Sequence, residues 1–531
     1  MASSSTAVAV PPSKPEIRRV VRGAFVAAAM LAGLLLSLAF CARTEGTTND
    51  GLEYMTGGMS LWSGHGYRTM MGQDDVIFPP GYPILIGALW RLLHDPILAG
   101  RLVSLIASLL AILLVYLLAS KVSPGRPATI AAWLFALLPV RVMTSGMVWS
   151  ESLFVALALG GVLAWIAAED RPRYAVGGGA LLGAAYLTRP EGLLILAVGA
   201  AARLASGSRR AASWKQLALL VMGFAIISSP YLLYLRTHTG AWRLTGKMET
   251  NLAVAEARAR NVPWEMLYTL SPDDRTVITP TPTGGLRELA DRYLLNVRRE
   301  TSLLLDTFVL GPYLLACAGL GLVATPWTPR ARRAWPLVLA LAAPVLVLPV
   351  FFVESRMLLV ALAPALVLAG TAFARADDLP ARQAPPTRLL LSYGLLAVAA
   401  TLLVKGNADL HTYYAPINYQ PLMAAVQRTA EAPGPIVGNK GLAFKTGRLH
   451  LTTPYEPLAR VLRYARYHEA AFMVVTTRDH PELAGLALDP ITTEDLLPVA
   501  RVEYHAADEP VIEQLYRLRP AHSTNRRIPK A

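Results

Sequence analysis

The chain has 531 residues, of which 54% are hydrophobic and only 16% charged, and its mean hydropathy is +0.40. Because a soluble domain carries about 25% charged residues, this composition excludes an ordinary soluble protein and predicts an integral membrane protein with many spans. The net charge of +14 fits basic cytoplasmic loops that face anionic lipid, and no basic stretch interleaved with aromatic residues indicates nucleic-acid binding. The two cysteines, Cys41 and Cys317, lie in or beside apolar runs, which indicates packed thiols rather than a disulfide framework or a metal site.

Residues 1–19 are small and polar, then basic, and we expect a disordered cytoplasmic tail. A signal peptide is the alternative, since basic residues precede an apolar run, but we interpret that run as an uncleaved first helix. Apolar runs predict about eleven spans, at residues 20–42, 98–120, 127–140, 152–168, 174–188, 192–205, 214–235, 301–325, 334–353, 357–375 and 389–404. Residues 84–93 are apolar but short and follow two prolines, so we expect an interfacial helix there.

The basic residues predict the orientation of these spans. The positive charges within residues 14–22 place the N-terminus in the cytoplasm. Counting spans from there puts the basic short loops on the same side, at residues 121–126, 169–173, 203–215, 330–333 and 375–388. The loops with a single arginine then face outward, together with the opening loop inside residues 43–97, the segment 236–300 and the tail.

The tail, residues 405–531, is predicted to be a separate domain outside the cytoplasm. Short strands are expected in GPIVGNK, HLTT and AFMVVTTRD, and helices at residues 421–431 and 457–467. Alternating strands and helices are typical of a small α/β unit. The expected fold is therefore an α-helical polytopic membrane protein with about 11 transmembrane helices in residues 20–404 and a small C-terminal α/β extracytoplasmic domain.

The most informative stretch is the polar opening loop, residues 44–83. It holds the acids Asp50 and Glu53, together with Tyr54, His65 and Tyr82, and it ends in a proline-rich exit. A solvated loop is the simplest interpretation. Loops nevertheless carry chemistry more often than the elements they join, and polar residues this dense beside a span indicate a functional site.

Acids and arginines also stand in the short outer loops. Glu151 opens a span, where it could simply interact with the helix dipole. Arg189 and Glu191 flank a proline and could form a local ion pair, and Glu354 and Arg356 could snorkel at the interface. The alternative to these separate explanations is that the residues meet at one membrane surface.

Asp50 has no evident helical or capping role in the sequence. A carboxylate suits a general base that takes a proton from an acceptor, and the donor fork of arginine suits phosphate. These groups at an outer membrane face predict attack by a polar acceptor on a group carried by a lipid phosphate. Since ATP is not available outside the cytoplasm, a lipid carrier must bring the activated group across.

Several short motifs, in this order, resemble a known family. They are NDGLEY at residues 49–54, GHGY at 64–67, FPPGYP at 78–83, RLVS at 101–104, WSESLF at 149–154 and GAAYLTRPEG at 183–192. The set resembles the GT-C class of membrane glycosyltransferases, in particular the family 39-like group. That group includes protein O-mannosyltransferases and is related to the aminoarabinose transferase of lipid A. The resemblance covers roughly residues 18–370.

The resemblance implies a polyprenyl-phosphate sugar donor, transfer by inversion, and Asp50 as the catalytic base or acceptor-orienting carboxylate. Gly51 stands where many relatives carry a second acid, and Glu53 is our second choice for the catalytic role. Phe78 replaces the lysine that precedes the paired prolines in the aminoarabinose transferase, so other residues must hold the donor phosphate. We expect these to be, in order, Arg356, Arg236 and Arg189. The acceptor or substrate pocket is expected to contain Glu151, Tyr54, His65, Tyr82 and Glu354.

We expect no cofactor and no metal, since no His, Cys or acid spacing indicates a closed metal site; a divalent cation is the less favoured alternative. The expected partners are a polyprenyl-phosphate sugar lipid, the bilayer of the inner (plasma) membrane, and a lipid, glycan or protein acceptor. A transporter or flippase for lipid-linked sugars is a different possibility, which would favour charges at mid-membrane. A non-catalytic scaffold is another, and loss of the Asp50 carboxylate would not affect it.

Overall fold

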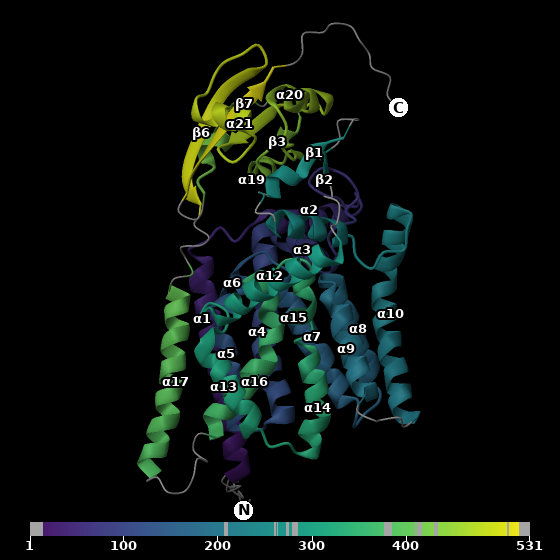
Figure 1. Ribbon diagram of the computed structural model, residues 1–531, viewed down its shortest axis with the longest axis vertical. Coiled ribbons are helices and arrows are strands. Elements are labelled where there is room, and N and C mark those ends of the chain that lie inside the picture. The colour runs from purple at the N-terminus through teal and green to yellow at the C-terminus, as the bar shows by residue number, and fades with distance from the viewer. Residues whose placement is uncertain are drawn as a thin grey trace, which may run out of the picture.

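The computed structural model describes residues 14–205, 211–259, 262, 264–271, 276–278, 285–375, 385–408, 410, 417–429, 434–506 and 509–519. These residues form a bundle of long helices with an α/β segment stacked on one end (Figure 1). The first helix, α1, begins at the opposite end of the bundle (Figure 1). Among the described residues, the α/β segment therefore covers the end of the bundle opposite the start of α1 (Figure 1).

The bundle contains helices at every position where a span was expected. Each expected span overlaps one or two of them, and they are α1 (Lys14–Cys41), α4 (Pro96–Val122), α5 (Arg126–Leu137), α6 (Pro139–Gly146), α7 (Glu151–Ala167), α8 (Tyr174–Thr188), α9 (Glu191–Ala205), α10 (Ala211–Thr239), α13 (Gly311–Ala324), α14 (Pro329–Ala340), α15 (Pro344–Val347), α16 (Leu359–Arg375) and α17 (Pro385–Ala408). The protein is thus a polytopic, mostly helical membrane protein.

Among the described residues, 5 helical segments are long and apolar enough to cross a membrane, and the bent pair α5 and α6 would make a sixth. Other helices of the bundle are apolar but shorter, such as α7 with 17 residues and α13 with 14. A full bilayer crossing needs about 20 residues. The expected count of about eleven spans therefore stays a prediction.

The bend between α5 and α6 has a local cause. Leu138 precedes Pro139 and has φ −59° and ψ 125°, outside the helical region, because the proline ring disfavours helical geometry in the residue before it. The two helices meet at 58°. After α6, Val148 donates a backbone hydrogen bond to Gly46 O at 2.7 Å. This bond joins the start of α7 to the opening loop.

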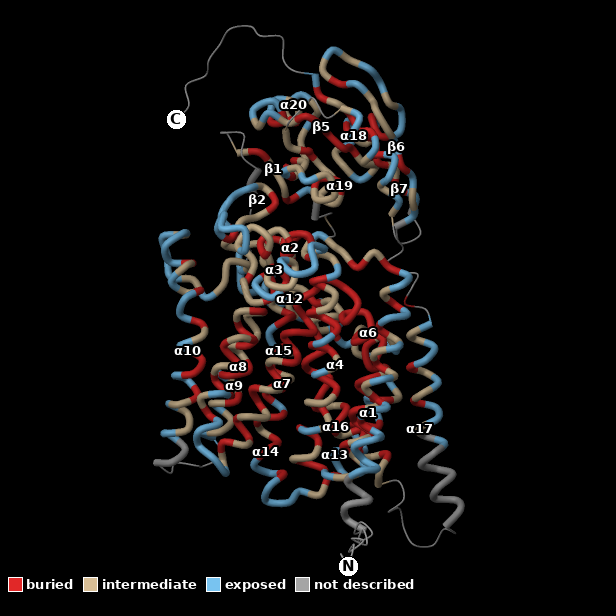
Figure 2. Tube along the Cα trace, turned by 180° about the vertical axis from the view of Figure 1, so that it is seen from behind, coloured by how far each residue is buried: buried red, intermediate tan, exposed pale blue. Residues whose placement is uncertain are grey.

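Burial separates the inner helices from the outer ones. Figure 2 shows α4, α7 and α16 mostly buried and the rim helices α10 and α17 largely exposed. In α16, 72% of the apolar window is buried, compared with 28% in α1 and in α10. Exposed apolar side chains such as Leu35 and Ile226 would be costly in water but suit contact with lipid tails.

The opening loop is more ordered than expected, because it contains the helix α2 (Asn49–Trp62) and leads into α3 (Gly81–Leu93). Asp50 lies in the first turn of α2, where the helix dipole stabilises an acid. The expectation that Asp50 has no helical role was therefore wrong. Glycines, serine and threonine hid this helix, because their propensity for helix is low, and packing of its buried face onto α3 and α4 stabilises it instead.

The second outer segment adds α11 (Met248–Ala259), the 3-10 turn η1 (Trp264–Leu267), a two-stranded sheet and α12 (Leu286–Leu305). The strands β1 (Tyr268–Leu270) and β2 (Thr276–Ile278) pair antiparallel. Two further 3-10 turns, η2 (Leu348–Val350) and η3 (Ser355–Leu358), precede α16. Of these, β1 and β2 lie beneath the α/β segment and α12 lies at the upper end of the bundle (Figure 1).

The α/β segment begins at Gln420 and contains the strands and helices expected in the tail, plus others. Its elements are α18 (Gln420–Arg428), β3 (Ile436–Val437), α19 (Lys440–Lys445), β4 (His450–Leu451), α20 (Leu458–Tyr467), β5 (Phe472–Thr476), α21 (Pro481–Leu488), β6 (Leu496–Ala506) and β7 (Glu509–Leu518). The sheet has 5 strands in the order β4-β3-β5-β7-β6. β4, β3 and β5 are parallel, whereas β7 runs antiparallel to β5 and β6.

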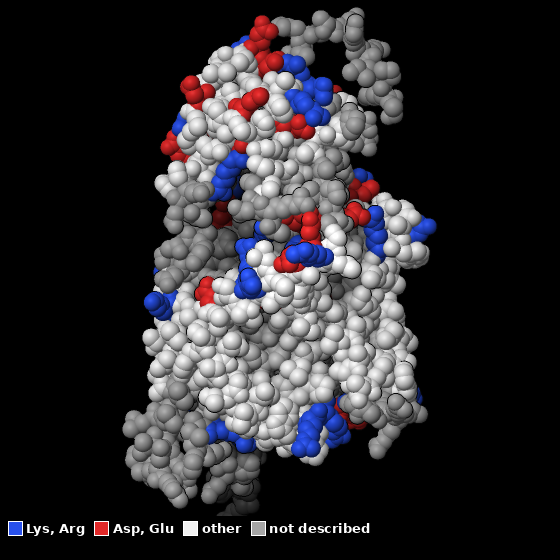
Figure 3. Space-filling view, in the orientation of Figure 1, with Lys and Arg blue, Asp and Glu red and all other residues white. Residues whose placement is uncertain are grey.

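Specific contacts join the α/β segment to the outer loops. Lys440 forms an ion pair with Glu53 at 2.7 Å, and Lys445 pairs with Glu45. His450 N donates to Met70 O at 3.0 Å. Charged side chains of both signs lie at this junction in Figure 3, above a broad band of the bundle surface without Lys, Arg, Asp or Glu. Polar chemistry is therefore concentrated where the two parts meet.

Candidate functional site

A cavity of about 1500 Å³ lies between the helical bundle and the α/β segment. We call the part formed by the bundle and its outer loops the floor; it includes Asp50, Arg189 and Arg356. We call the part formed by the α/β segment the wall; it includes Asn439 and Tyr455. Six of the expected site residues line this one cavity: Asp50, Glu53, Tyr54, Arg189, Glu354 and Arg356.

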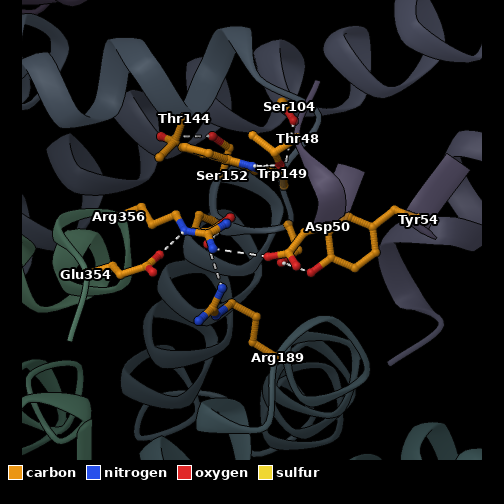
Figure 4. A network of polar contacts seen from close by, with 12 residues as sticks. Thr48, Asp50, Tyr54, Ser104, Thr144, Trp149, Ser152, Arg189, Glu354 and Arg356 are labelled. Carbon is orange, nitrogen blue, oxygen red and sulfur yellow. Dashed lines mark hydrogen bonds and ion pairs between the residues drawn. The ribbon is translucent and has the colours of Figure 1, made fainter. Parts of the chain in front are cut away.

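Asp50 and Arg356 meet at the centre of the floor (Figure 4). Arg356 Nη2 donates to Asp50 Oδ2 at 3.0 Å, although the two residues are 306 positions apart in the sequence. Asp50 comes from α2 and Arg356 from η3, directly before α16. The Asp50 side chain is 33% exposed to the cavity and Arg356 15%. A carboxylate and a guanidinium are therefore both accessible to a ligand at the same point.

Arg356 is held from several sides. Its Nε donates to Glu354 Oε2 at 2.8 Å, and its Nη1 lies 3.4 Å from Glu151 Oε1. Its Cζ lies 4.5 Å from the centre of the Trp149 ring, an arrangement that favours a cation over an aromatic face. Arg258 donates to the other Glu354 oxygen at 2.9 Å. The fork of Arg356 is thus fixed in direction before any ligand binds.

Arg189 completes the charged network (Figure 4). Its Nη1 donates to Glu151 Oε1 at 2.7 Å and its Nη2 to Glu191 Oε1 at 3.0 Å. Glu151 is the first residue of α7 and its side chain is only 3% exposed. The structure contains the expected local ion pair of Arg189 with Glu191, and Glu151 does begin a helix. In addition, one oxygen of Glu151, Oε1, contacts both Arg189 and Arg356. Local and site roles therefore coexist.

Tyr54 and Tyr82 support the floor in different ways. Tyr54 shares a hydrogen bond with Ser150 Oγ at 3.3 Å, and its ring packs edge-on against Phe78 and Tyr82 at 5.2 and 5.3 Å between centroids. Tyr82 is fully buried, shares a hydrogen bond with Ser104 at 2.7 Å, and does not line the cavity. Tyr82 therefore supports Tyr54 from below instead of facing a substrate.

Lys247 is a site residue that the sequence analysis missed. Its Nζ lies 3.9 Å from the centre of the Phe78 ring and 5.9 Å from that of Tyr54, and it lines the cavity. Gly246 permits this placement, because a Cβ there would lie 1.6 Å from Val76 O. Lys247, from another segment, thus lies over Phe78, the residue that replaces the lysine found before the paired prolines in the aminoarabinose transferase.

Neighbouring cations control the charge of Asp50. Burial by itself would raise the pKa of this carboxyl, but Lys247 and Arg356 outweigh it and lower the pKa to about 2. The same balance applies to Glu354, where burial opposes the effect of Arg356 and Arg258 and the pKa is lowered. Both carboxylates are therefore ionised at neutral pH, and the floor keeps separated negative and positive charges.

Glu53 lies in the cavity lining but is engaged on both oxygens. Oε1 pairs with Lys440 at 2.7 Å and Oε2 accepts from Met70 N at 3.0 Å. Its side chain is only 9% exposed. The geometry makes Glu53 a docking residue for the α/β segment and leaves Asp50 as the carboxylate that faces the cavity.

Two expected site residues lie elsewhere. His65 is exposed beyond the end of α2, where its carbonyl accepts from Arg68 Nε at 3.1 Å. Arg236 is exposed in the last turn of α10 and donates to the carbonyl of Gly240. Neither lines the cavity, so the structure does not bring them to the other residues.

Other contributors were missed for a common reason. Lys247, Arg258 and Lys440 stand outside the short loops that the span count fixed in space. One signal did exist. Phe78 stands where the resembling motif has a lysine, so another segment has to supply the cation, and residues 236–300 were a candidate source.

Among the residues that the structure describes, no group of three or more His, Cys, Asp or Glu side chains is placed to hold a metal ion.

Comparison with known proteins gives a match to a family model over part of the chain and a shared fold. Residues 78–234 match the sequence model of the family described as dolichyl-phosphate-mannose-protein mannosyltransferase. The matched stretch contains Glu151 and Arg189 but neither Asp50 nor Arg356. No curated protein matches the chain by sequence.

Solved structures share the fold over most of the chain. ArnT from Cupriavidus metallidurans, solved with bound undecaprenyl phosphate, aligns with a TM-score of 0.59 and 15% identity, covering 92% of this chain and 97% of that one. The oligosaccharyltransferase AglB from Archaeoglobus fulgidus, solved with an inhibitory peptide and a dolichol-phosphate, aligns at 0.55 with 14% identity, covering 86% and 69%.

The mycobacterial arabinofuranosyltransferase AftD aligns at 0.52 with 15% identity, covering 94% of this chain but 40% of that one. All three named structures are of GT-C glycosyltransferases. The family-model match and the shared fold together confirm the expected resemblance: the chain has the GT-C fold, with a stretch of mannosyltransferase-like sequence in its N-terminal half.

Proposed function

We propose that the protein is a glycosyltransferase that moves a sugar from a polyprenyl-phosphate donor to a lipid, glycan or protein acceptor at the extracytoplasmic membrane face. The observation that carries this proposal is the contact of Asp50 with Arg356, 3.0 Å apart and both exposed to the cavity. This reaction needs a general base and a group that binds the donor phosphate, and Asp50 and Arg356 can fill these two roles.

The donor phosphate has a set of cations on the floor. Among the described residues Lys247 makes no ion pair, and aromatic rings are its neighbours. Arg356 and Arg189 add fixed donor forks, which suit phosphate oxygens. We therefore revise the expected order to Lys247 and Arg356, then Arg189. Apolar side chains of α9 and α15, such as Leu193, Ala197 and Val347, line the cavity beside them and suit a prenyl chain.

The reaction is a single displacement at the anomeric carbon. An acceptor hydroxyl or amine forms the new bond to that carbon, and the bond from the carbon to the phosphate oxygen breaks. The electron pair leaves with the polyprenyl phosphate, whose charge the cations of the floor stabilise. Asp50 takes the proton of the acceptor. Attack from the face opposite the phosphate inverts the anomeric configuration, as the resemblance implies.

Arg356 couples phosphate binding to the base. With a pKa of about 2, Asp50 is a weak base while Arg356 donates to it. A phosphate that accepts from Arg356 Nη2 competes with Asp50 for the same group. Donor binding would then raise the pKa of Asp50 and improve it as a proton acceptor. The enzyme would thus acquire its base when the leaving group is in place.

We place the protein in the inner (plasma) membrane, with its N-terminus in the cytoplasm and the α/β segment outside. Support comes from the basic start of the chain and from α1, which begins at the end of the bundle opposite the cavity (Figure 1). The cavity then faces the compartment without ATP, where a lipid-linked sugar is the available donor.

No cofactor or metal is part of the proposal, because Lys247, Arg356 and Arg189 supply the positive charge that the leaving phosphate requires. Transfer measured with and without EDTA tests this part, and loss of transfer that Mg²⁺ or Mn²⁺ restores would contradict it. A transporter or flippase is not favoured, since Asp50, Arg189 and Arg356 line the cavity at the end of the bundle that meets the α/β segment.

The test uses the purified full chain in nanodiscs with a radiolabelled polyprenyl-phosphate sugar and an extract of cell-envelope lipids and glycans. We expect labelled product and free polyprenyl phosphate from the unmodified protein and neither from Asp50→Asn. The matched control is Asp74→Asn, an exposed aspartate of the same outer loop that pairs with Arg68. Equal transfer by Asp50→Asn and the unmodified protein would refute the proposal. Mass spectrometry of envelopes with and without the gene would name the product.

A further inference from the structure

The wall of the cavity has an organisation that the floor does not explain. β4, β3 and β5 run parallel, so their carboxyl ends meet at one edge of the sheet. The residues that follow them, 438–441, 452–455, and 476 with 478–480, all line the cavity. In open α/β sheets, ligands bind at the carboxyl ends of the strands where the chain order reverses. Here the reversal falls at β3, which has β4 on one side and β5 on the other.

The loop after β3 is shaped for close approach. Gly438 has φ +103°, and a Cβ there would lie 2.3 Å from Val474 O on β5, so only glycine fits. Asn439 then accepts from Leu442 N at 2.7 Å and donates to Glu513 Oε2 at 2.6 Å. Tyr504 donates to the other oxygen of Glu513 at 2.7 Å. The polar groups of the wall are thus held in fixed directions by one another.

The wall carries little net charge toward the cavity. Lys440 and Lys445 are paired with Glu53 and Glu45 of the floor, and Arg478 and Asp479 contribute one charge of each sign. The Glu513 carboxyl also lines the cavity; it accepts from Asn439 and Tyr504, and burial raises its pKa. Burial, assisted by Lys440, lowers the pKa of His450 to about 3, so this ring is neutral. The wall therefore differs from the phosphate-binding floor and offers neutral hydrogen-bonding groups.

Aromatic faces stand among these neutral groups. The Tyr455 ring packs edge-on against His480 with 5.3 Å between centroids, and both line the cavity beside Thr452 and Thr453. Hydroxyl and amide groups that donate and accept hydrogen bonds, next to aromatic faces, match a ligand with many hydroxyls and apolar C–H faces. An uncharged sugar has both features.

The wall is also near the base. Glu53, which binds Lys440, lies three positions after Asp50 on α2, and residues at this spacing are neighbours on a helix face, about 5–6 Å between Cβ atoms. Lys440 contributes to lowering the pKa of Asp50. A ligand held against the loop at 438–441 would therefore reach the carboxylate of Asp50 with a hydroxyl group.

A peptide fits this wall less well. Peptides add to a sheet through free backbone groups of an edge strand. At the β4 edge, His450 N already donates to Met70 O at 3.0 Å, and Tyr455 N donates to Tyr268 O at 2.7 Å. The opening loop and β1 thus occupy the backbone that a peptide would use.

We infer that the strand-end wall, residues 438–441, 452–455, 476 and 478–480, is an acceptor subsite for uncharged sugar residues, which makes the acceptor a glycan or the sugar headgroup of a glycolipid. This inference rests on the proposed function. The wall binds a sugar ring through the threonines after β4 and the Tyr455 face, and directs one hydroxyl toward Asp50.

The experiment is saturation-transfer NMR on the full chain in phosphatidylglycerol nanodiscs. The probes are methyl glycosides of glucose, galactose, mannose and arabinose, together with maltotriose, in one arm. The other arm uses dioctanoyl diglucosylglycerol in the nanodisc. We expect saturation transfer to at least one probe, with both arms positive for a sugar site and only the second positive if a lipid anchor is required for affinity.

Variants of the wall locate the binding. Tyr455→Ala should weaken probe binding about five- to tenfold, the range expected for loss of one aromatic contact, while Tyr455→Phe keeps most of it and shows that the fold is intact. Tyr467→Ala is the matched control, because Tyr467 is a 59% exposed tyrosine of the same segment, outside the cavity lining. Thr453→Val should weaken binding by a smaller factor.

The inference is overturned if no probe in either arm shows saturation transfer, if Tyr455→Ala and Tyr467→Ala bind equally, or if a Ser/Thr peptide binds at the wall in place of the sugars. Release of polyprenyl phosphate from the donor, dependent on Asp50, is measured in parallel. That release reports on the proposed function alone, so failure of the sugar site and failure of the transferase proposal give different results.

Discussion

The floor and the wall of the same cavity use opposite electrostatics. On the floor, Asp50 and Glu354 face Arg356 across 3.0 and 2.8 Å, and each carboxylate remains ionised. On the wall, Lys440 and Lys445 are neutralised by acids of the outer loops, and hydroxyls, amides and rings remain. Charge at one surface and neutral hydrogen bonding at the other suit two ligands of different chemistry, a phosphate and a polyol, that must meet between them.

The two regions also differ in what fixes them. Short loops between packed helices hold Arg189 and Arg356, so their positions follow from the bundle. The wall depends on contacts made late in the chain, through Lys440 and His450. Substitutions should therefore separate into floor effects on the donor and base, and wall effects on the acceptor. The predictions below are ordered from the largest expected effect to the smallest.

Asp50→Asn tests the floor most directly. Asparagine keeps the shape but cannot take a proton, so transfer should fall ~10²–10⁴-fold, the usual contribution of a general base. Asp50→Glu should lose less, because the carboxylate is present but displaced. The measurement is transfer of label with saturating donor. Equal rates for Asp50→Asn and the Asp74→Asn control would remove Asp50 from the catalytic role.

Arg356→Ala should raise donor KM by about 10- to 100-fold, since charge-assisted hydrogen bonds are worth about 1.5–3 kcal/mol each. Arg356→Lys should be milder, because it keeps the charge but loses the fork. Acceptor KM should change little in either variant. The control is Arg501→Ala, which breaks the exposed pair with Glu503 on β6. An unchanged donor KM in Arg356→Ala would exclude a phosphate contact.

Lys247→Met should raise donor KM about tenfold by removing one cation from the floor while keeping an apolar chain over Phe78. Arg243→Ala is the matched control, because Arg243 lies in the same outer segment and pairs with the exposed Glu249. If both variants bind the donor as the unmodified protein does, Lys247 does not replace the missing motif lysine.

Glu53→Gln should lower transfer only a few-fold and through acceptor KM, because Glu53 positions the wall. The double variant Glu53→Gln with Lys440→Met should resemble either single one, since both remove the same ion pair. Additive losses in this cycle, or a loss as large as that of Asp50→Asn, would show that Glu53 acts in catalysis instead.

The pH dependence should give the smallest effect. A folded-state pKa of about 2 for Asp50 lies below the usual value, so the ionised base is present above it and is lost only as the pH falls through that value. Since Asp50 stays ionised over this range, its titration should not lower kcat/KM for the donor between pH 8 and pH 5. Lys247→Met removes a cause of the lowered pKa and should move the acid limb to higher pH. An acid limb at the same pH in both proteins would contradict this account.

The sequence was sufficient to predict those site residues whose positions are determined by the ends of the spans. Asp50, Glu151, Arg189, Glu354 and Arg356 all stand at the ends of apolar runs, so the membrane surface brings them to one level. The structure joins them in one network of ion pairs, in which Glu151 lies behind the cavity lining. Arg236 also stands at the end of an apolar run, but it does not line the cavity. The direction of a side chain at the end of a rim helix depends on packing, which sequence periodicity does not encode.

Lys247 and the strand-end wall required the folded chain. The position of Lys247 follows from a close approach between Gly246 and Val76 O, 170 positions apart. No local sequence pattern predicts this approach. In the tail, the expected strands and helices were found, but the hairpin of β6 and β7 was missed. Its alternation of exposed Arg501 and Glu503 with buried Val502 is a strand signal that was present.

The ion pair of Lys445 with Glu45 joins residues 400 positions apart, and this separation has a consequence for biogenesis. In the proposed orientation, the bundle helices precede the α/β segment in the chain and insert before it, and the α/β segment must cross the membrane before it can dock. Until it docks, the wall of the cavity is not in place, and a donor bound to the floor would meet solvent instead of an acceptor. Docking of the α/β segment should therefore limit when a newly made chain becomes able to carry out the proposed transfer.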